Sequence, residues 1–185
     1  RAYAAIVPDV VEQGVTNIFN NLSEVKYFAN HLLQGKPLQA GNDAARLLIN
    51  STVGVVGLFD VASHFDMYAQ AEDFGQTLGY WGVESGPYVV LPLLGPSSVR
   101  DGISLTVDQQ LDPLADYQPK DHRLGLQVLQ VLDTRNQLQD LQHLVIGDEY
   151  TFVRDAYLAR RAMLIRDGRP VTNMDTESDE FDEFD

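Results

Sequence analysis

The chain has 185 residues, 44% of them hydrophobic, and a formal net charge of −14. This is enough for one folded domain with a sizeable core. The acidic balance argues against free nucleic-acid binding, which needs clustered Lys and Arg. The absence of cysteine excludes disulfide and thiolate chemistry within this chain.

The acidic residues are concentrated at the C-terminal end, where seven of them and no basic residue fall between Asp175 and Asp185. We therefore predict a folded domain over residues 1–170 and an acidic, disordered tail over 171–185. Phe181 and Phe184 are the only apolar residues of the acidic run. Such a tail is typical either of a docking peptide for a basic partner or of a simple solubilising segment.

No apolar run reaches the length of about 18 residues that a membrane-spanning helix needs. The chain begins at Arg1 without Met, inside an apparent helix, and its first residues do not have the pattern expected of a signal peptide. We expect a fragment or a processed form whose targeting information lay upstream.

The periodicity predicts a mainly α-helical domain with one small hairpin. The expected helices cover residues 1–7, 9–33 with a break or kink at 23–25, 37–50, 74–80, 95–112, 121–146 and 148–166. A short strand is expected over 88–91, ended by Pro92. Asp73 and Ser98 are expected to act as N-terminal helix caps.

The stretch from Phe74 to Gly102 holds six of the fourteen glycines, three of the eight prolines and the only tryptophan. It is too interrupted for one long helix and too apolar for an ordinary exposed loop. We predict a ridge packed by Trp81, Tyr80 and Tyr88. The alternative is a buried hairpin that serves only the core.

The chain lacks convincing catalytic or metal-binding motifs. His64 lies between Asp60 and Asp66, a proximity expected by chance in an acidic chain. Ser97 and Ser98 lack the second glycine of a hydrolase elbow, and a capping role explains them. The glycines of Phe74–Gly82 fit close packing better than phosphate binding. We therefore predict no enzyme activity, no cofactor and no metal.

Several charged residues occur within apolar helices, notably Asp43 with Arg46, and Arg154 with Asp155 and Asp148. They can be read as surface ion pairs of little energetic weight. They can also be read as the polar lining of a water-filled passage between helices.

Five segments, in order along the chain, carry a resemblance to a known family. They are VPDVVEQGVTNIFNNLSEVKYFANHLLQGK (7–36), RLLINSTVGVVGLFDVA (46–62), DFGQTLGYWGVESGPYVVLPLLGPSSVRDG (73–102), DTR (133–135) and DEYTFVRDAYLARR (148–161). The sequence resembles the MlaA (VacJ) family, lipoproteins of the Gram-negative outer membrane that maintain lipid asymmetry.

The resemblance implies a ring-like bundle of amphipathic helices with a small apolar ridge or hairpin, lying in the inner leaflet of the outer membrane. It implies an amphipathic channel that removes mislocalised phospholipids from the outer leaflet and passes them to the periplasmic carrier MlaC. It also implies association with trimeric porins. Family members have a lipidated N-terminal cysteine on the periplasmic side, and this chain has no Cys.

Within this reading, the ridge that contacts the leaflet is Tyr88, Val89, Val90, Leu91, Pro92, Leu93 and Leu94. Arg135 and Arg154 are candidates for channel-facing cations that attract lipid phosphate, and Phe181 and Phe184 for docking of the carrier. The alternative function is a scaffold that binds porins and the carrier but conducts no lipid. A lipid-cleaving enzyme is a third, poorly supported reading.

Overall fold

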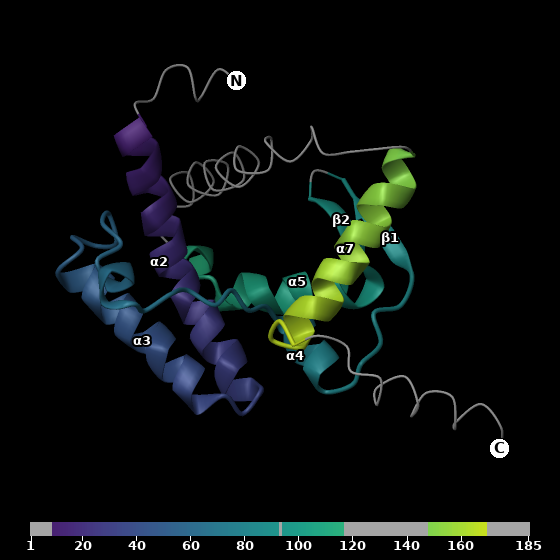
Figure 1. Cartoon of the computed structure of the whole chain (residues 1–185), viewed down its shortest axis with the longest axis horizontal. Coiled ribbons are helices and arrows are strands. Elements are labelled where there is room, and N and C mark those ends of the chain that lie inside the picture. The colour runs from purple at the N-terminus through teal and green to yellow at the C-terminus, as the bar shows by residue number, and fades with distance from the viewer. Residues whose placement is uncertain (1–8, 93, 117–147, 170–185) are drawn as a thin grey trace.

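A computed structural model describes residues 9–92, 94–116 and 148–169. Two long helices, α2 (Asp9–Leu33) and α3 (Pro37–Thr52), lie side by side and form one side of the molecule (Figure 1). The turn between them contains Gly35 at a φ of 71°, a conformation that favours glycine. Pro37 begins α3, where its missing N–H is not needed.

The predicted break at residues 23–25 is wrong, because α2 is continuous through them. Ser23 Oγ donates to Phe19 O one turn back, at 2.9 Å, so its hydroxyl is satisfied within the helix. Glu24 is fully buried against α3. Contacts with another helix thus outweigh the weak local preference of these residues.

After α3 the chain forms a loop over residues 53–59 and then the short 3₁₀ helix η1 (Ala62–Phe65). Backbone hydrogen bonds fasten the loop to the end of α3, including Gly57 N to Asn50 O at 2.8 Å. Val55 and Val56 have φ values of 53° and 58°. This left-handed conformation is unusual and costly for β-branched residues.

The Gly- and Pro-rich middle of the chain forms α4 (Phe74–Tyr80), the strands β1 (Tyr88–Leu91) and β2 (Gly95–Ser98), and α5 (Val99–Leu111). The strands pair antiparallel, with Tyr88 opposite Ser98 and Leu91 opposite Gly95. The prediction of helix from Gly95 is wrong, because strand pairing extends to Ser98. Both predicted caps are confirmed, since Asp73 accepts from Gln76 N and Ser98 from Asp101 N.

The 3₁₀ helix η2 (Pro113–Asp116) follows α5, and α7 (Glu149–Ile165) packs against α4 and β2. Figure 1 shows α7 crossing the hairpin on the side of the molecule away from α3. The helices predicted over 1–7 and 121–146 lie outside the described residues. A mainly α fold with one small apolar hairpin is confirmed.

Burial in this fold is inverted relative to a water-soluble domain. Among the described residues, four hydrophobic residues are buried, against 18 polar or charged ones. Over the same ranges, 23 large hydrophobic side chains are exposed, with Leu38 at 86% and Val56 at 71%. Large contiguous apolar surface normally marks contact with an apolar partner or a membrane. No helix in the described part of the chain is long and apolar enough to cross a bilayer.

Candidate functional site

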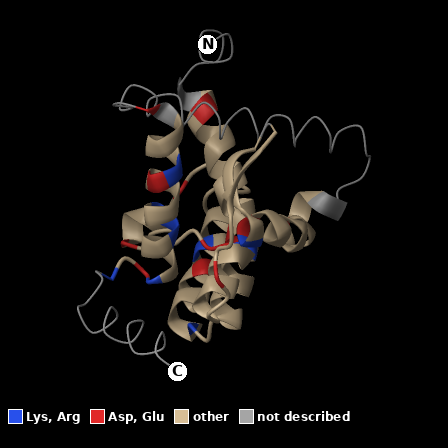
Figure 2. Ribbon diagram, turned by 90° about the vertical axis from the view of Figure 1, so that its right-hand side faces the viewer, with Lys and Arg blue, Asp and Glu red and all other residues tan. Residues whose placement is uncertain are grey.

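The polar interior consists of three charged clusters at the crossings of helices. Figure 2 shows basic and acidic positions next to one another where the elements meet. We name the clusters after a central residue in each: the Arg46, His31 and Arg161 clusters.

The Arg46 cluster joins α2, α3 and the segment that follows α3. Arg46 Nε donates to Glu24 Oε1 at 2.6 Å, and both residues are at most 3% exposed. The guanidinium also donates to Ser63 Oγ and to Met67 O, and its Nη2 lies 3.4 Å from Asp60 Oδ1. One arginine therefore holds together segments more than forty residues apart along the chain.

The pKa values of the two carboxylates in this cluster are shifted in opposite directions. Burial raises the pKa of Glu24 to about 7, although the hydrogen bond and charge of Arg46 act in the other direction. For Asp60, burial alone would raise the pKa. Hydrogen bonds from Ser63 and Asn50 and the charge of Arg46 outweigh it and lower the pKa. Glu24 is thus a buried carboxyl that titrates near neutral pH.

The His31 cluster joins α2, α3, the segment before α4 and the turn after α7. His31 Nδ1 lies 2.5 Å from Asp43 Oδ2, and its Nε2 lies 3.7 Å from Glu72 Oε1. Lys36 pairs with Glu72 at 3.5 Å and with Asp167. Burial raises the pKa of Glu72, against the effect of Gln34, Lys36 and His31.

The Arg161 cluster joins α7 to α4 and α5. Arg161 donates two hydrogen bonds to Asp73, at 2.6 and 2.9 Å, and a third to Asp101 Oδ1 at 2.9 Å. Tyr157 Oη donates to Asp101 Oδ2 at 2.6 Å. Burial and this carboxylate raise the pKa of Tyr157 to about 12. Such bidentate, charge-assisted contacts fix the position of α7.

Two glycines of α4 make room for this cluster. A Cβ at Gly75 would lie 2.5 Å from Asp101 Oδ1 and 2.7 Å from Arg161 Nη2. A Cβ at Gly79 would lie 2.5 Å from Ile165 Cδ1. The prediction that the glycines of this segment serve close packing is therefore confirmed for Gly75 and Gly79. It is wrong for Gly82, where an added Cβ would meet nothing within 4 Å and the φ of 87° favours glycine instead.

Asp43 and Arg46 are not a surface ion pair, so that reading is wrong. They are 0% and 3% exposed and have different partners, His31 and Glu24. The two side chains are buried among their bonding partners, so they do not face a water-filled passage as the alternative required. Sequence reasoning missed Glu24, which it had placed in a helix break. The apolar residues around Glu24 on a helix were the available signal.

The predicted channel and docking residues stay predictions. Arg154 lies on α7 with 39% of its side chain exposed, and its Nε donates to Asp155 Oδ1 at 2.9 Å. Arg135, Phe181 and Phe184 lie outside the described residues.

The predicted ridge does form a hairpin, but its packing differs from the prediction. Tyr88 contacts the rings of Tyr150 and Tyr157, at centroid distances of 5.7 and 6.0 Å. Trp81 instead contacts Phe74, at 6.2 Å. Three residues of the ridge are half-buried: Tyr88, Val89 and Leu91. Three are exposed: Val90, Pro92 and Leu94. Leu93 lies outside the described residues. The alternative of a buried hairpin is wrong.

Comparison with known proteins identifies the family. The family model described as MlaA lipoprotein matches residues 1–164. The chain belongs to the MlaA lipoprotein family. The "Intermembrane phospholipid transport system lipoprotein MlaA" of Shigella flexneri is 33% identical over 172 residues, which cover 90% of this chain and 68% of that protein. The protein of the same name from Haemophilus influenzae is 29% identical, with 95% and 72% covered.

The fold is also that of a solved family structure. That structure is described as the "Structural basis for maintenance of bacterial outer membrane lipid asymmetry". It matches with a TM-score of 0.76 and 32% sequence identity, over 89% of this chain and 84% of its own. Several relatives from Rickettsia species are uncharacterised, among them one from Rickettsia felis that is 32% identical over 89% of this chain and 64% of its own.

Proposed function

We propose that this chain is a phospholipid transport protein of the outer membrane. It removes mislocalised phospholipids from the outer leaflet through an amphipathic channel and passes them to the periplasmic carrier MlaC. Its family membership supports the lipid substrate, since its relatives are named for intermembrane phospholipid transport.

The observation that carries the proposal is the inverted burial. An apolar exterior suits hydrocarbon surroundings, and a charged interior suits a polar path for headgroups. Val90 and Leu94, at 58% and 60% exposed, would enter the leaflet from the hairpin. The mechanism is passive and needs no nucleotide, metal or catalytic group, because the protein only replaces the polar surroundings that a headgroup loses in the bilayer.

Trimeric porins and MlaC are the proposed partners, and the proposed location is the periplasmic side of the outer membrane, through an anchor in the precursor. Arg135 and Arg154 would attract lipid phosphate, and Phe181 with Phe184 would dock the carrier. Arg154 needs only to exchange its exposed partner Asp155 for a phosphate, which costs little at a solvated surface.

The test measures movement of labelled phospholipid from the purified protein to MlaC. Replacing Arg135 and Arg154 together by Ala should slow transfer by about tenfold, through the loss of two charge-assisted contacts. Arg160→Ala is the matched control, since Arg160 is an exposed arginine on the same helix. Unchanged transfer in the double variant would remove these two residues from the mechanism. A stable complex with MlaC but no lipid transfer by the unmodified protein would favour the scaffold instead. Release of free fatty acid would favour an enzyme.

A further inference from the structure

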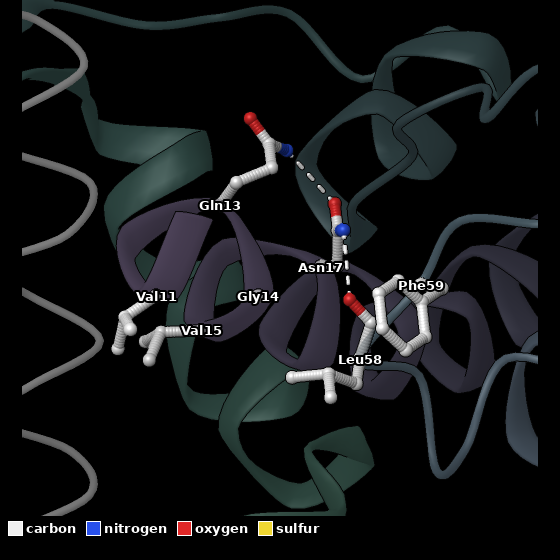
Figure 3. Close-up of a pocket in the computed structure, with 7 residues that line it drawn as sticks. All are labelled: Val11, Gln13, Gly14, Val15, Asn17, Leu58 and Phe59. Carbon is white, nitrogen blue, oxygen red and sulfur yellow. Dashed lines mark hydrogen bonds between the residues drawn. The ribbon is translucent and has the colours of Figure 1, made fainter. Parts of the chain in front are cut away.

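A groove on the outside of the protein lies between the first turns of α2 and the loop 53–59 (Figure 3). It has a volume of about 540 Å³. The described residues that line it are Val11, Gln13, Gly14, Val15, Asn17, Leu58 and Phe59. None of these carries a charge, in contrast to the three clusters of the interior.

The two side-chain amides of the groove are hydrogen-bonded to one another and to Leu58. Gln13 Nε2 donates to Asn17 Oδ1 at 2.9 Å, and Asn17 Nδ2 donates to Leu58 O at 3.0 Å. Figure 3 shows this chain of amides along one edge, with Val11 and Val15 on the other side. A ligand therefore meets hydrocarbon over most of the groove and finds few free partners for polar groups of its own.

The floor of the groove depends on a glycine. A Cβ at Gly14 would lie 2.7 Å from Leu58 Cδ1, so the glycine lets the end of the Leu58 side chain lie against α2 without a shift. The groove is thus formed by a specific close contact between two segments forty-four residues apart.

The loop that forms one wall is held in a strained conformation that turns its apolar side chains outward. Val55 and Val56 have positive φ values and are 59% and 71% exposed, whereas Gly54 and Gly57 are buried. A β-branched residue in this conformation costs on the order of 1–3 kcal/mol and persists only where the surrounding bonds impose it. Val56 N bonds to Ser51 O and Phe59 N bonds to Gly54 O, which impose it here. The loop that forms one wall of the groove therefore also exposes two apolar side chains.

We propose that this groove binds one acyl chain of a phospholipid. This inference rests on the proposed function, and it assigns the apolar part of the substrate to a site separate from the charged interior. An acyl chain suits the groove because it has no polar group to satisfy and gains from contact with every lining side chain. An extended peptide would bring unpaired backbone groups into a wall whose amides are occupied.

The experiment uses the purified chain in detergent and a phosphatidylethanolamine with a photoactivatable diazirine on one acyl chain. After illumination, mass spectrometry maps the adducts. We expect adducts at residues 11–17 and 58–59. In Val11→Trp, where the indole fills the open end of the groove, their yield should fall about tenfold, because a few methylenes lose their contacts.

Val83→Trp is the matched control, because Val83 is also a half-exposed valine, at 46% against 52% for Val11, and lies outside the groove. Its adduct yield should equal that of the unmodified chain. Far-ultraviolet circular dichroism confirms that both variants are folded. A diazirine-labelled fatty acid, tested in parallel, distinguishes a phospholipid from a free fatty acid as the source of the chain.

Equal adduct yields in Val11→Trp and the unmodified chain would overturn the proposal that the groove binds an acyl chain. Adducts confined to other segments would also overturn it. Preferential labelling by the free fatty acid, or a cross-link that places a protein helix in the groove, would also overturn the phospholipid assignment. Transfer of unlabelled phospholipid to MlaC, measured on the same samples, separates the two proposals. If phospholipid transfer persists while the groove residues carry no adduct, the groove proposal is wrong and the proposed transport function stands. If the unmodified chain neither retains nor transfers phospholipid, the proposed function fails.

Discussion

The buried carboxyl of Glu24 makes the stability of the α2–α3 pair depend on pH near neutrality. Its ordinary pKa of 4.5 rises to about 7 in the folded protein. Between these values, the folded state keeps a proton that the unfolded chain has lost. The free energy of unfolding therefore falls as pH rises through this range, and the full loss above pH 7 is about 3 kcal/mol.

Glu24→Gln removes this titration and keeps an acceptor for Arg46 Nε, which now lies 2.6 Å from Glu24 Oε1. The stability of the variant relative to the unmodified chain should rise by about 3 kcal/mol between pH 4.5 and pH 8. For a chain of this size, that corresponds to a rise of about 6–12 °C in the difference between the two melting temperatures.

The assay is thermal unfolding in one mild detergent, followed by circular dichroism at several pH values from 4.5 to 8. The difference between variant and parent is the quantity of interest, because Glu72 and Asp108 also have pKa values raised by burial and titrate in both chains. Glu84→Gln is the control, since Glu84 is exposed. A difference in melting temperature between Glu24→Gln and the parent that stays the same at every pH in this range would show that Glu24 does not titrate near neutral pH.

Three further substitutions test the charge pairing of α7 and the packing of α4 and α3. Arg161→Met should destabilise the protein by about 3–5 kcal/mol, because it leaves Asp73 and Asp101 without their shared cation; an unfolding midpoint like that of the control Arg160→Met would contradict this. Gly79→Ala should cost about 1–3 kcal/mol through the clash with Ile165. Gly41→Ala on α3, where an added Cβ would meet no side chain and no other segment within 4 Å, should instead stabilise by about 0.5–1 kcal/mol. Equal effects of the two alanines on the melting temperature would show that packing around α4 does not matter.

Local signals in the sequence predicted the local structure well. The helix Phe74–Tyr80, its cap Asp73 and the strand Tyr88–Leu91 follow from short-range chemistry and are confirmed. The extension of pairing through Gly95–Ser98 was missed, because a strand is defined by its partner and not by its own residues.

The direction in which each helix faces was much harder to predict. On α3, the apolar side chain of Leu48 is 65% exposed. On the same helix, Asp43 and Arg46 are buried. The periodicity of a helix indicates that it has an apolar and a polar face, but it does not indicate whether each face contacts protein, water or lipid. Only the partners, distant in sequence, decide that the charged face of α3 points inward.

The inverted burial also changes what holds the fold together. In a membrane, packing apolar side chains against one another gains little over packing them against lipid, so helix association depends on close contact and polar bonds. This chain has both devices: the glycines at 14, 75 and 79 admit close neighbours, and the three charged clusters join segments distant in the sequence. Since the low dielectric of a lipid environment strengthens such charge pairs and makes an unpaired charge costlier, removing one member should be more damaging than removing an exposed leucine. For a protein proposed to lie in one leaflet, the charged interior is therefore the main source of its cohesion, and any polar path for lipid headgroups has to share that interior with the bonds that maintain the fold.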